Sequence, residues 1–387
     1  MRFPSFFHLS FSFSPSALSF DLSQLDFSAN GLDSVLGVIL NCGGGPDGNY
    51  IGGEYWSNPG AFNHGFKGLC GVFVSAAFAY AGTELVGLAA AETVNPGKSL
   101  PTAAKQVFWR ITIFYVVSLT IIGLLVPYND PRLLSGSSSA DAKASPFVIA
   151  ITNAGIDVLD SVMNAVIMIS VLSVGNASVY GSSRTMAALA EQGQAPRILA
   201  YIDRQGRPLV AILVAAAIGC LCFLAASNQR REAFEWMVAI SGLSSILTWG
   251  SICLAHIRFR KGWKAQDHSL DELAFTSQAG VIGSWIGLAL NVLILIVQFW
   301  VAFAPVGYAE MSVSGRVGNF FSSYLTIPVV ILCYFPYKKY YRTTFVKAED
   351  MDLRTGRRDF SFPHFLAEER EERANWPLWK KIYKLFC

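Results

Sequence analysis

Seven apolar stretches of about 20 residues constrain this chain more than any other feature of its sequence. They lie near residues 67–91, 107–126, 161–182, 208–227, 233–256, 281–303 and 319–337. A helix of roughly 20 apolar residues crosses the hydrocarbon core of a bilayer, which is about 30 Å thick. Inside lipid, helices and closed barrels are the structures that satisfy their own backbone hydrogen bonds. The pattern therefore predicts an all-α, polytopic membrane protein with about seven transmembrane helices.

The composition excludes several classes of function. Charged residues make up 15% of the chain, against about 25% in a soluble domain. No basic face with stacked aromatic residues is present, so we expect no nucleic-acid partner. The seven cysteines show neither zinc spacing nor a disulfide framework, and the turn-rich segment 43–48 lacks the Gly-Lys-Ser/Thr ending of a phosphate loop. We expect no metal, no cofactor and no enzyme activity.

Glu84 is the only ionisable side chain that lies well inside any of the apolar stretches. A carboxylate at that depth in a bilayer costs about 2.5–3.5 kcal/mol on insertion scales, so it must face a partner, a bundle interior or a water-filled path. Gly82 and Gly87 flank the acid and weaken a helix at the same point. A membrane helix that weakens beside an acid is typical of a substrate or ion site.

Two interpretations of this segment are open. In the first, Gly82 lets the helix open, and Glu84 relays a proton or fixes the opened geometry. The backbone groups freed by the opening would then contact a substrate; they belong to Tyr80, Ala81 and Thr83. In the second, Glu84 is a structural acid hydrogen-bonded to a neighbouring helix, and Gly82 only allows close packing. We predict the first interpretation.

A polar stretch, residues 241–251, lies inside the apolar stretch 233–256. Four of its hydroxyl residues fall near one helical face: Ser241, Ser244, Ser245 and Thr248. These side chains either line a pathway or hydrogen-bond between helices.

The distribution of Lys and Arg predicts the orientation in the membrane. Residues 41–66 hold neither, whereas the tail 338–387 is dense in both, so the first span begins outside and the tail is cytoplasmic. The predicted parts are an atypical Ser/Phe-rich N-terminal segment 1–32, a remnant helix end with an extracellular loop 33–66, the membrane domain 67–337 and the cytoplasmic tail 338–387. The last residue, Cys387, follows aromatic and basic residues and is a candidate for S-palmitoylation; an ordinary free thiol is the alternative.

Several short runs occur in an order that points to a family. They are Asn41–Pro46, Ala81–Gly87, Ser173–Asn176 with Tyr180–Arg184, Ser241–Ser245 and Asp350–Leu353. From about Gly37 to Cys387, the chain resembles the fungal amino-acid permeases, the yeast amino acid transporter branch of the amino acid-polyamine-organocation superfamily.

The resemblance implies twelve spans and a five-plus-five inverted repeat, of which the seven stretches here would be the sixth to the twelfth. The chain then resembles an N-terminally truncated member with a partial inverted-repeat permease fold. Glu84 falls on the discontinuous sixth helix, which binds the amino-acid backbone of the substrate, and Phe78 becomes a candidate hydrophobic gate. Ser244 and Thr248 fall on the tenth helix, which contributes to the pathway, and Cys387 matches a palmitoylated terminal cysteine.

On these grounds we expect proton-coupled amino-acid uptake across the plasma membrane, with an amino acid, a proton and the lipid bilayer as partners. The alternative is a truncated, non-transporting membrane relic or an amino-acid sensor of the same family. Neither the particular amino acid nor the oligomeric state follows from the sequence.

Overall fold

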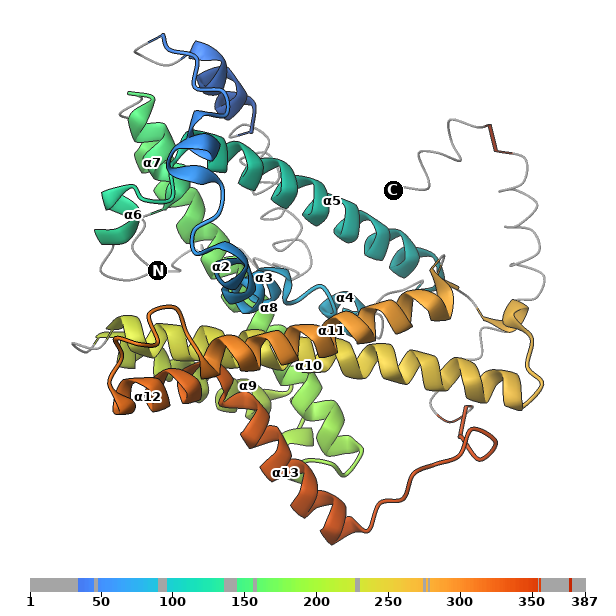
Figure 1. Cartoon of the computed structure of the whole chain (residues 1–387). Helices are drawn as coiled ribbons and strands as arrows, with labels where there is room; N and C mark the ends of the chain where they lie inside the picture. The colour runs from blue at the N-terminus through green and yellow to red at the C-terminus, as the bar shows by residue number, and fades with distance from the viewer. Residues whose placement is uncertain are drawn as a thin grey trace, which may run out of the picture. The chain divides into compact units, whose positions relative to one another are not determined.

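The described part of the chain is built from helices and their connections. The computed structural model describes residues 34–44, 48–89, 96–135, 145–155, 159–226, 230–273, 276–277, 279–353, 355 and 376–377. Within those ranges there is no strand, so the all-α prediction is confirmed (Figure 1). The predicted N-terminal segment 1–32 and Cys387 lie outside the described residues.

The chain forms two compact units. One comprises Met1–Ala61 with Ile113–Leu221, and the other comprises Phe62–Thr112 with Cys222–Cys387. The long helix α5 (Pro96–Leu125) contributes residues to both.

The first unit is assembled around the end of α5. Leu125 and Val126 pack against Ile149 and Ala150 of α7 (Pro146–Asn153), and α7 packs on α8 (Leu159–Glu191). The other elements of this unit are η1 (Leu40–Gly44), η2 (Trp56–Gly60), α6 (Pro131–Ser135), η5 (Arg197–Ala200), α9 (Leu209–Gly219) and the start of η6 (Cys220–Ala226).

An ion pair closes the turn after α5 in this unit. Arg132 donates to both carboxylate oxygens of Asp130, at 3.1 and 2.8 Å, and also to Asn153 Oδ1 of α7 at 2.8 Å. The hydrogen bonds from Arg132 to Asp130 hold the pKa of this buried carboxyl below its ordinary value. The pair therefore links the connection after α5 to α7.

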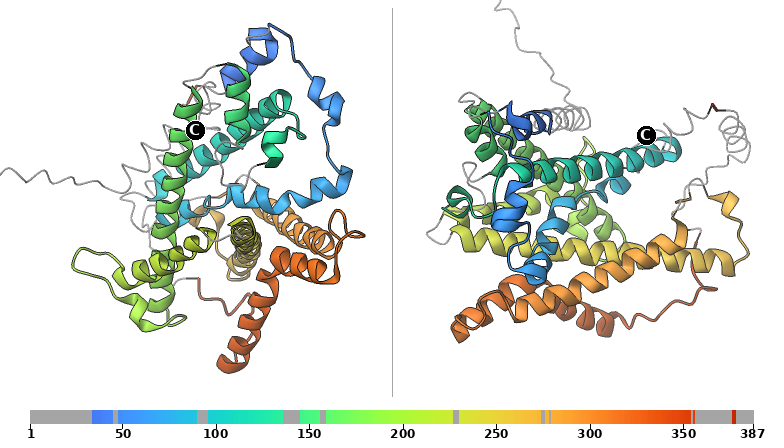
Figure 2. Two further views of the ribbon diagram at one scale, coloured as in Figure 1. Left: turned by 90° about the vertical axis from the view of Figure 1, so that its left-hand side faces the viewer. Right: turned by 45° about the horizontal axis from the view of Figure 1, so that its top comes forward.

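The second unit is organised by α10 (Arg230–Ala265) and α11 (Gly280–Phe303), which run side by side (Figures 1 and 2). Its remaining helices are α2 (Gly65–Gly71), α3 (Phe73–Tyr80), α4 (Leu85–Ala89), η7 (Leu270–Glu272), α12 (Val313–Tyr324) and α13 (Thr326–Tyr341). Its core cluster joins Val74 and Ala77 of α3 to Leu243 and Ile246 of α10.

A glycine permits the close approach of α3 and α10. A Cβ atom at Gly242 would lie 2.8 Å from the Val74 carbonyl oxygen and 2.7 Å from Val74 Cγ1. Small residues at helix interfaces in membranes allow such backbone approach. The same device appears between α10 and α11, where a Cβ at Gly287 would lie 3.0 Å from Cys253 Sγ.

Within the described residues, five helical segments are long and apolar enough to cross a membrane: Gly65–Leu88, Leu100–Leu125, Ser161–Glu191, Trp236–Ala265 and Gly280–Phe303. The helix pair Val313–Tyr324 and Thr326–Tyr341, bent by 62°, makes a sixth if it is counted as one span. Pro328 follows that bend and has no N–H for the carbonyl of Tyr324 four residues earlier. The multi-pass prediction is confirmed, but within the described residues five or six helices meet this criterion where seven were predicted.

The predicted span at 208–227 is shorter than expected. Its α-helix ends at Gly219, and the chain continues as a 3-10 helix over Cys220–Ala226. Only Leu209–Phe223 remains as an apolar helix, which is below the length of a full span. The hydropathy of this stretch is continuous, but glycine is a weak helix former and marks the change of helix type.

Candidate functional site

The helix that carries Glu84 is interrupted where its glycines predict. α3 ends at Tyr80, and α4 begins at Leu85. Between them Ala81 is extended, with φ −61° and ψ 144°, and Gly82 has φ +96°. Residues with a side chain rarely adopt that value of φ, so Gly82 allows the chain to leave the helix here.

The Glu84 carboxylate lies inside this interruption and joins it to a second helix. Its Oε2 atom accepts a hydrogen bond from the Gly82 N–H at 3.1 Å and another from the Trp249 Nε1–H of α10 at 3.2 Å. The acid therefore fixes the opened geometry locally and also connects it to a neighbouring helix. Each of the two interpretations of the sequence describes one of these hydrogen bonds.

Sequence reasoning missed Trp249, the residue that completes this arrangement. Trp249 packs against the core cluster of Val74, Ala77, Leu243 and Ile246. An indole N–H in an apolar setting needs an acceptor, and Trp249 lies in the polar stretch 241–251. The need of Trp249 for a hydrogen-bond acceptor could therefore have been recognised from the sequence, although the sequence did not identify Glu84 as its acceptor.

Two backbone groups of the interruption are already engaged. The Ala81 N–H donates to the Phe78 carbonyl at 3.1 Å, and the Leu85 N–H donates to the Gly82 carbonyl at 3.0 Å. With the Gly82 N–H bound to Glu84, the interruption is a closed turn. A substrate that uses the N–H of Ala81 or Gly82 has to displace one of these hydrogen bonds.

A cavity of about 220 Å³ lies beside the interruption, within the second unit. Tyr80 and Thr83 form one wall, and α5 supplies the other through Ala104, Val107, Phe108, Ile111 and Thr112. Pockets for drug-sized ligands have volumes of about 300–1,000 Å³, so this cavity suits a smaller group. It brings the predicted residues Tyr80 and Thr83 together with α5, which the sequence did not predict.

Ser244 and Thr248 are on α10, but the structure does not bring them to Glu84. Ser244 Oγ donates to the Ser241 carbonyl at 2.8 Å, and Thr248 Oγ1 donates to the Ser244 carbonyl at 2.9 Å. At about 100° per residue, both point about 120–160° away from Gly242, which faces α3. Both are exposed, so their part in substrate binding stays a prediction.

Phe78 is 40% exposed on α3, and its role as a gate also stays a prediction. Among the residues that the structure describes, no group of three or more His, Cys, Asp and Glu side chains could hold a metal ion. The predicted lipidation site, Cys387, lies beyond the described tail.

Comparisons with known proteins agree on one family. The family described as "Amino acid permease" matches residues 32–349. The chain is 56% identical over 359 residues to the general amino-acid permease GAP2 of Candida albicans, which covers 91% of this chain and 60% of that relative. It is 54% identical over 363 residues to the general amino-acid permease GAP1 of Saccharomyces cerevisiae, covering 91% and 59%.

The histidine permease of Saccharomyces cerevisiae is 51% identical over 347 residues, covering 88% of this chain and 57% of the relative. The chain thus spans about 60% of the length of the curated relatives that it matches. No solved structure matches it.

Proposed function

This chain belongs to the amino acid permease family, and from that premise we propose that it carries amino acids across a membrane in symport with protons. The observation that carries the proposal is the interrupted helix, in which a single carboxylate within an apolar segment holds both the turn at Gly82 and the contact with α10. Non-helical backbone at membrane depth is tolerated where it is buried in protein or lines a cavity.

The proposed proton step uses the hydrogen bonds of Glu84. A carboxylate accepts only, whereas a protonated carboxyl carries one O–H donor and loses acceptor capacity. Both contacts of Glu84 end on the same oxygen, Oε2. A proton on that oxygen would weaken the hydrogen bonds from Gly82 and Trp249 together, which releases the turn from α10.

The proposed substrate contacts are beside this acid. Tyr80 and Thr83 line the cavity next to the turn, and the N–H groups of Ala81 and Gly82 become available when the turn opens. A small zwitterion can offer a carboxylate to those N–H groups, and its ammonium group can donate to Glu84 Oε1, which stays an acceptor when Oε2 carries the proton. The identity of the amino acid is not part of the proposal, because relatives at similar identity are named both as general permeases and as a histidine permease.

The proposed location is the plasma membrane, with the C-terminal tail in the cytoplasm. Supporting this orientation, the end of α10 carries Arg258, Arg260, Lys261 and Lys264, and the end of α13 carries Lys338 and Lys339. Cytoplasmic ends of membrane helices are enriched in such residues.

The test is uptake of radiolabelled amino acids by yeast cells that lack their own general uptake and express this chain. We expect uptake with accompanying alkalinisation of the medium by the wild type, and loss of both in Glu84→Gln with surface expression retained. Glu310→Gln is the matched control, because Glu310 is an exposed acid in the turn after α11; it should transport normally.

Two outcomes contradict the proposal. If the wild type reaches the surface and takes up none of the amino acids tested, the chain is not a transporter. If Glu84→Gln transports like the wild type, Glu84 has no part in coupling.

A further inference from the structure

Along the end of α13, exposed apolar side chains are followed by aromatic and basic ones. A bilayer changes in the same order, from hydrocarbon through the interface to the headgroups. Val329, Val330, Ile331 and Leu332 are exposed, and exposed aromatic residues follow at Tyr334, Phe335, Tyr340 and Tyr341. Lys338 and Lys339 lie among the aromatics, and Arg342 ends the helix. Lys339 is seven residues after Leu332, about 10 Å along the axis, so the change spans one headgroup layer, about 5–7.5 Å thick, and the adjoining edge of the hydrocarbon.

Contacts among these side chains organise them. Lys338 Nζ donates to the Tyr334 hydroxyl at 3.3 Å and lies 5.5 Å from the centre of the same ring. The rings of Tyr337 and Tyr341 lie 4.5 Å apart, and those of Tyr340 and Tyr341 lie 4.9 Å apart. Tyrosine is enriched at membrane interfaces because its ring is apolar and its hydroxyl is polar.

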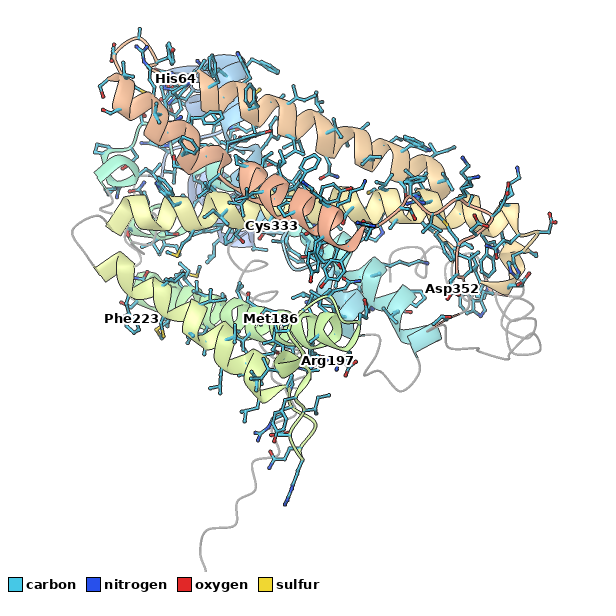
Figure 3. The ribbon with its side chains drawn as sticks, turned by 90° about the horizontal axis from the view of Figure 1, so that it is seen from below. His64, Met186, Arg197, Phe223, Cys333 and Asp352 are labelled. Atoms are coloured by element: carbon cyan, nitrogen blue, oxygen red, sulfur yellow. The ribbon has the colours of Figure 1, made fainter. Side chains whose placement is uncertain are left out.

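The segment after α13 joins this end to the end of α10. The Arg258 guanidinium carbon lies 4.0 Å from the centre of the Phe345 ring, and Arg258 also donates to the Val346 carbonyl. Further along, Gln266 Nε2 donates to the Met351 carbonyl at 2.8 Å. Figure 3 shows this part of the second unit, with Cys333 labelled on α13 and Asp352 labelled at the end of the segment 343–352.

The two joined ends carry an excess of positive charge. Residues 256–267 and 334–352 include eight basic residues, Arg258, Arg260, Lys261, Lys264, Lys338, Lys339, Arg342 and Lys347, and four acidic ones, Asp267, Glu349, Asp350 and Asp352. Within the described residues, none of the eight forms an ion pair with an acid. Their charge is thus available to an external anion.

We propose that the end of α13, residues 334–342, together with the basic end of α10, binds the headgroups of anionic phospholipids in the adjoining leaflet. Charge complementarity favours an anion, and the exposed apolar residues before the aromatics favour one attached to acyl chains. Each Lys or Arg near such a surface strengthens attraction to anionic lipid about fivefold. The inference concerns lipid binding by the second unit and does not depend on whether the chain transports amino acids.

The test measures, by native mass spectrometry, the binding of lipids to the purified, delipidated full chain in detergent. Phosphatidylserine and phosphatidylcholine with identical acyl chains are titrated separately. We expect the wild type to bind phosphatidylserine at least tenfold more tightly. Lys338→Gln combined with Lys339→Gln should reduce that preference about five- to 25-fold.

The charge-matched control combines Arg197→Gln with Arg204→Gln, two exposed arginines of the first unit, and should keep the wild-type preference. Tyr340→Ala combined with Tyr341→Ala leaves every charge in place. It should weaken the binding of both lipids, which separates the contribution of the aromatic rings from that of the charges. Equal binding of the two lipids by the wild type overturns the proposal. An unchanged preference for phosphatidylserine in the lysine variant also overturns it, as does an arginine control that loses as much of this preference as the lysine variant.

Discussion

Replacing Gly242 with alanine tests the approach of α3 and α10 that places Trp249 against Glu84. The added Cβ would lie 2.8 Å from the Val74 carbonyl oxygen, a backbone atom, and 2.7 Å from Val74 Cγ1. Since backbone cannot rotate away as a flexible side chain can, α3 and α10 have to separate. Overpacking of this kind costs typically about 1–3 kcal/mol.

Gly250→Ala is the matched control, because Gly250 lies on the same helix and a Cβ there would be 3.7 Å from Asn291 Cβ, an ordinary contact. Both variants gain the higher helix propensity of alanine, roughly 1 kcal/mol. The difference between them therefore isolates the steric cost. We expect Gly242→Ala to be less stable than Gly250→Ala by about 1–3 kcal/mol.

The assay is denaturant unfolding of the purified chain in mixed micelles, monitored by tryptophan fluorescence. We also expect Gly242→Ala to lose more transport than Gly250→Ala, since separation of α3 from α10 lengthens the hydrogen bond between Trp249 and Glu84. Equal stability of the two variants would refute the reasoning, because it would mean that the two backbones do not meet at Gly242.

Three further predictions concern single side chains. Trp249→Phe keeps an aromatic side chain but removes the N–H donor to Glu84 and part of the ring that packs on the core cluster, so we expect a loss of at least about 1–2 kcal/mol and impaired transport; unchanged uptake would show that this hydrogen bond has no role. Arg132→Ala should destabilise the chain by about 1–2 kcal/mol at neutral pH, because it leaves the buried Asp130 carboxylate without its main donor. The pKa of Asp130 is lowered in the folded state, so its stabilising effect is complete above the ordinary value and disappears as the pH falls through the lowered one; a stability gap between wild type and variant that does not narrow in acid contradicts this. Cys387→Ser should abolish acyl labelling of the chain, and labelling that persists excludes this residue as the acceptor.

Local sequence determined which segments become membrane helices and where one of them opens. Hydropathy predicts Gly65–Leu88, Leu100–Leu125 and the other long spans because burial of apolar side chains in lipid depends on composition and length. The interruption is predicted by Gly82, since only glycine adopts the positive φ angle found there at no steric cost. The shortening at Gly219 was not predicted, because hydropathy does not report the type of helix.

Tertiary structure decided what the acid touches. Glu84 and Trp249 are 165 residues apart in the chain, and they meet because Gly242 lets α3 approach α10. Periodicity grouped Ser244, Ser245 and Thr248 on one face, yet Ser245 is buried while the other two are exposed. A repeat in the sequence determines which residues share a face of a helix, whereas the direction of that face depends on the helices packed around it.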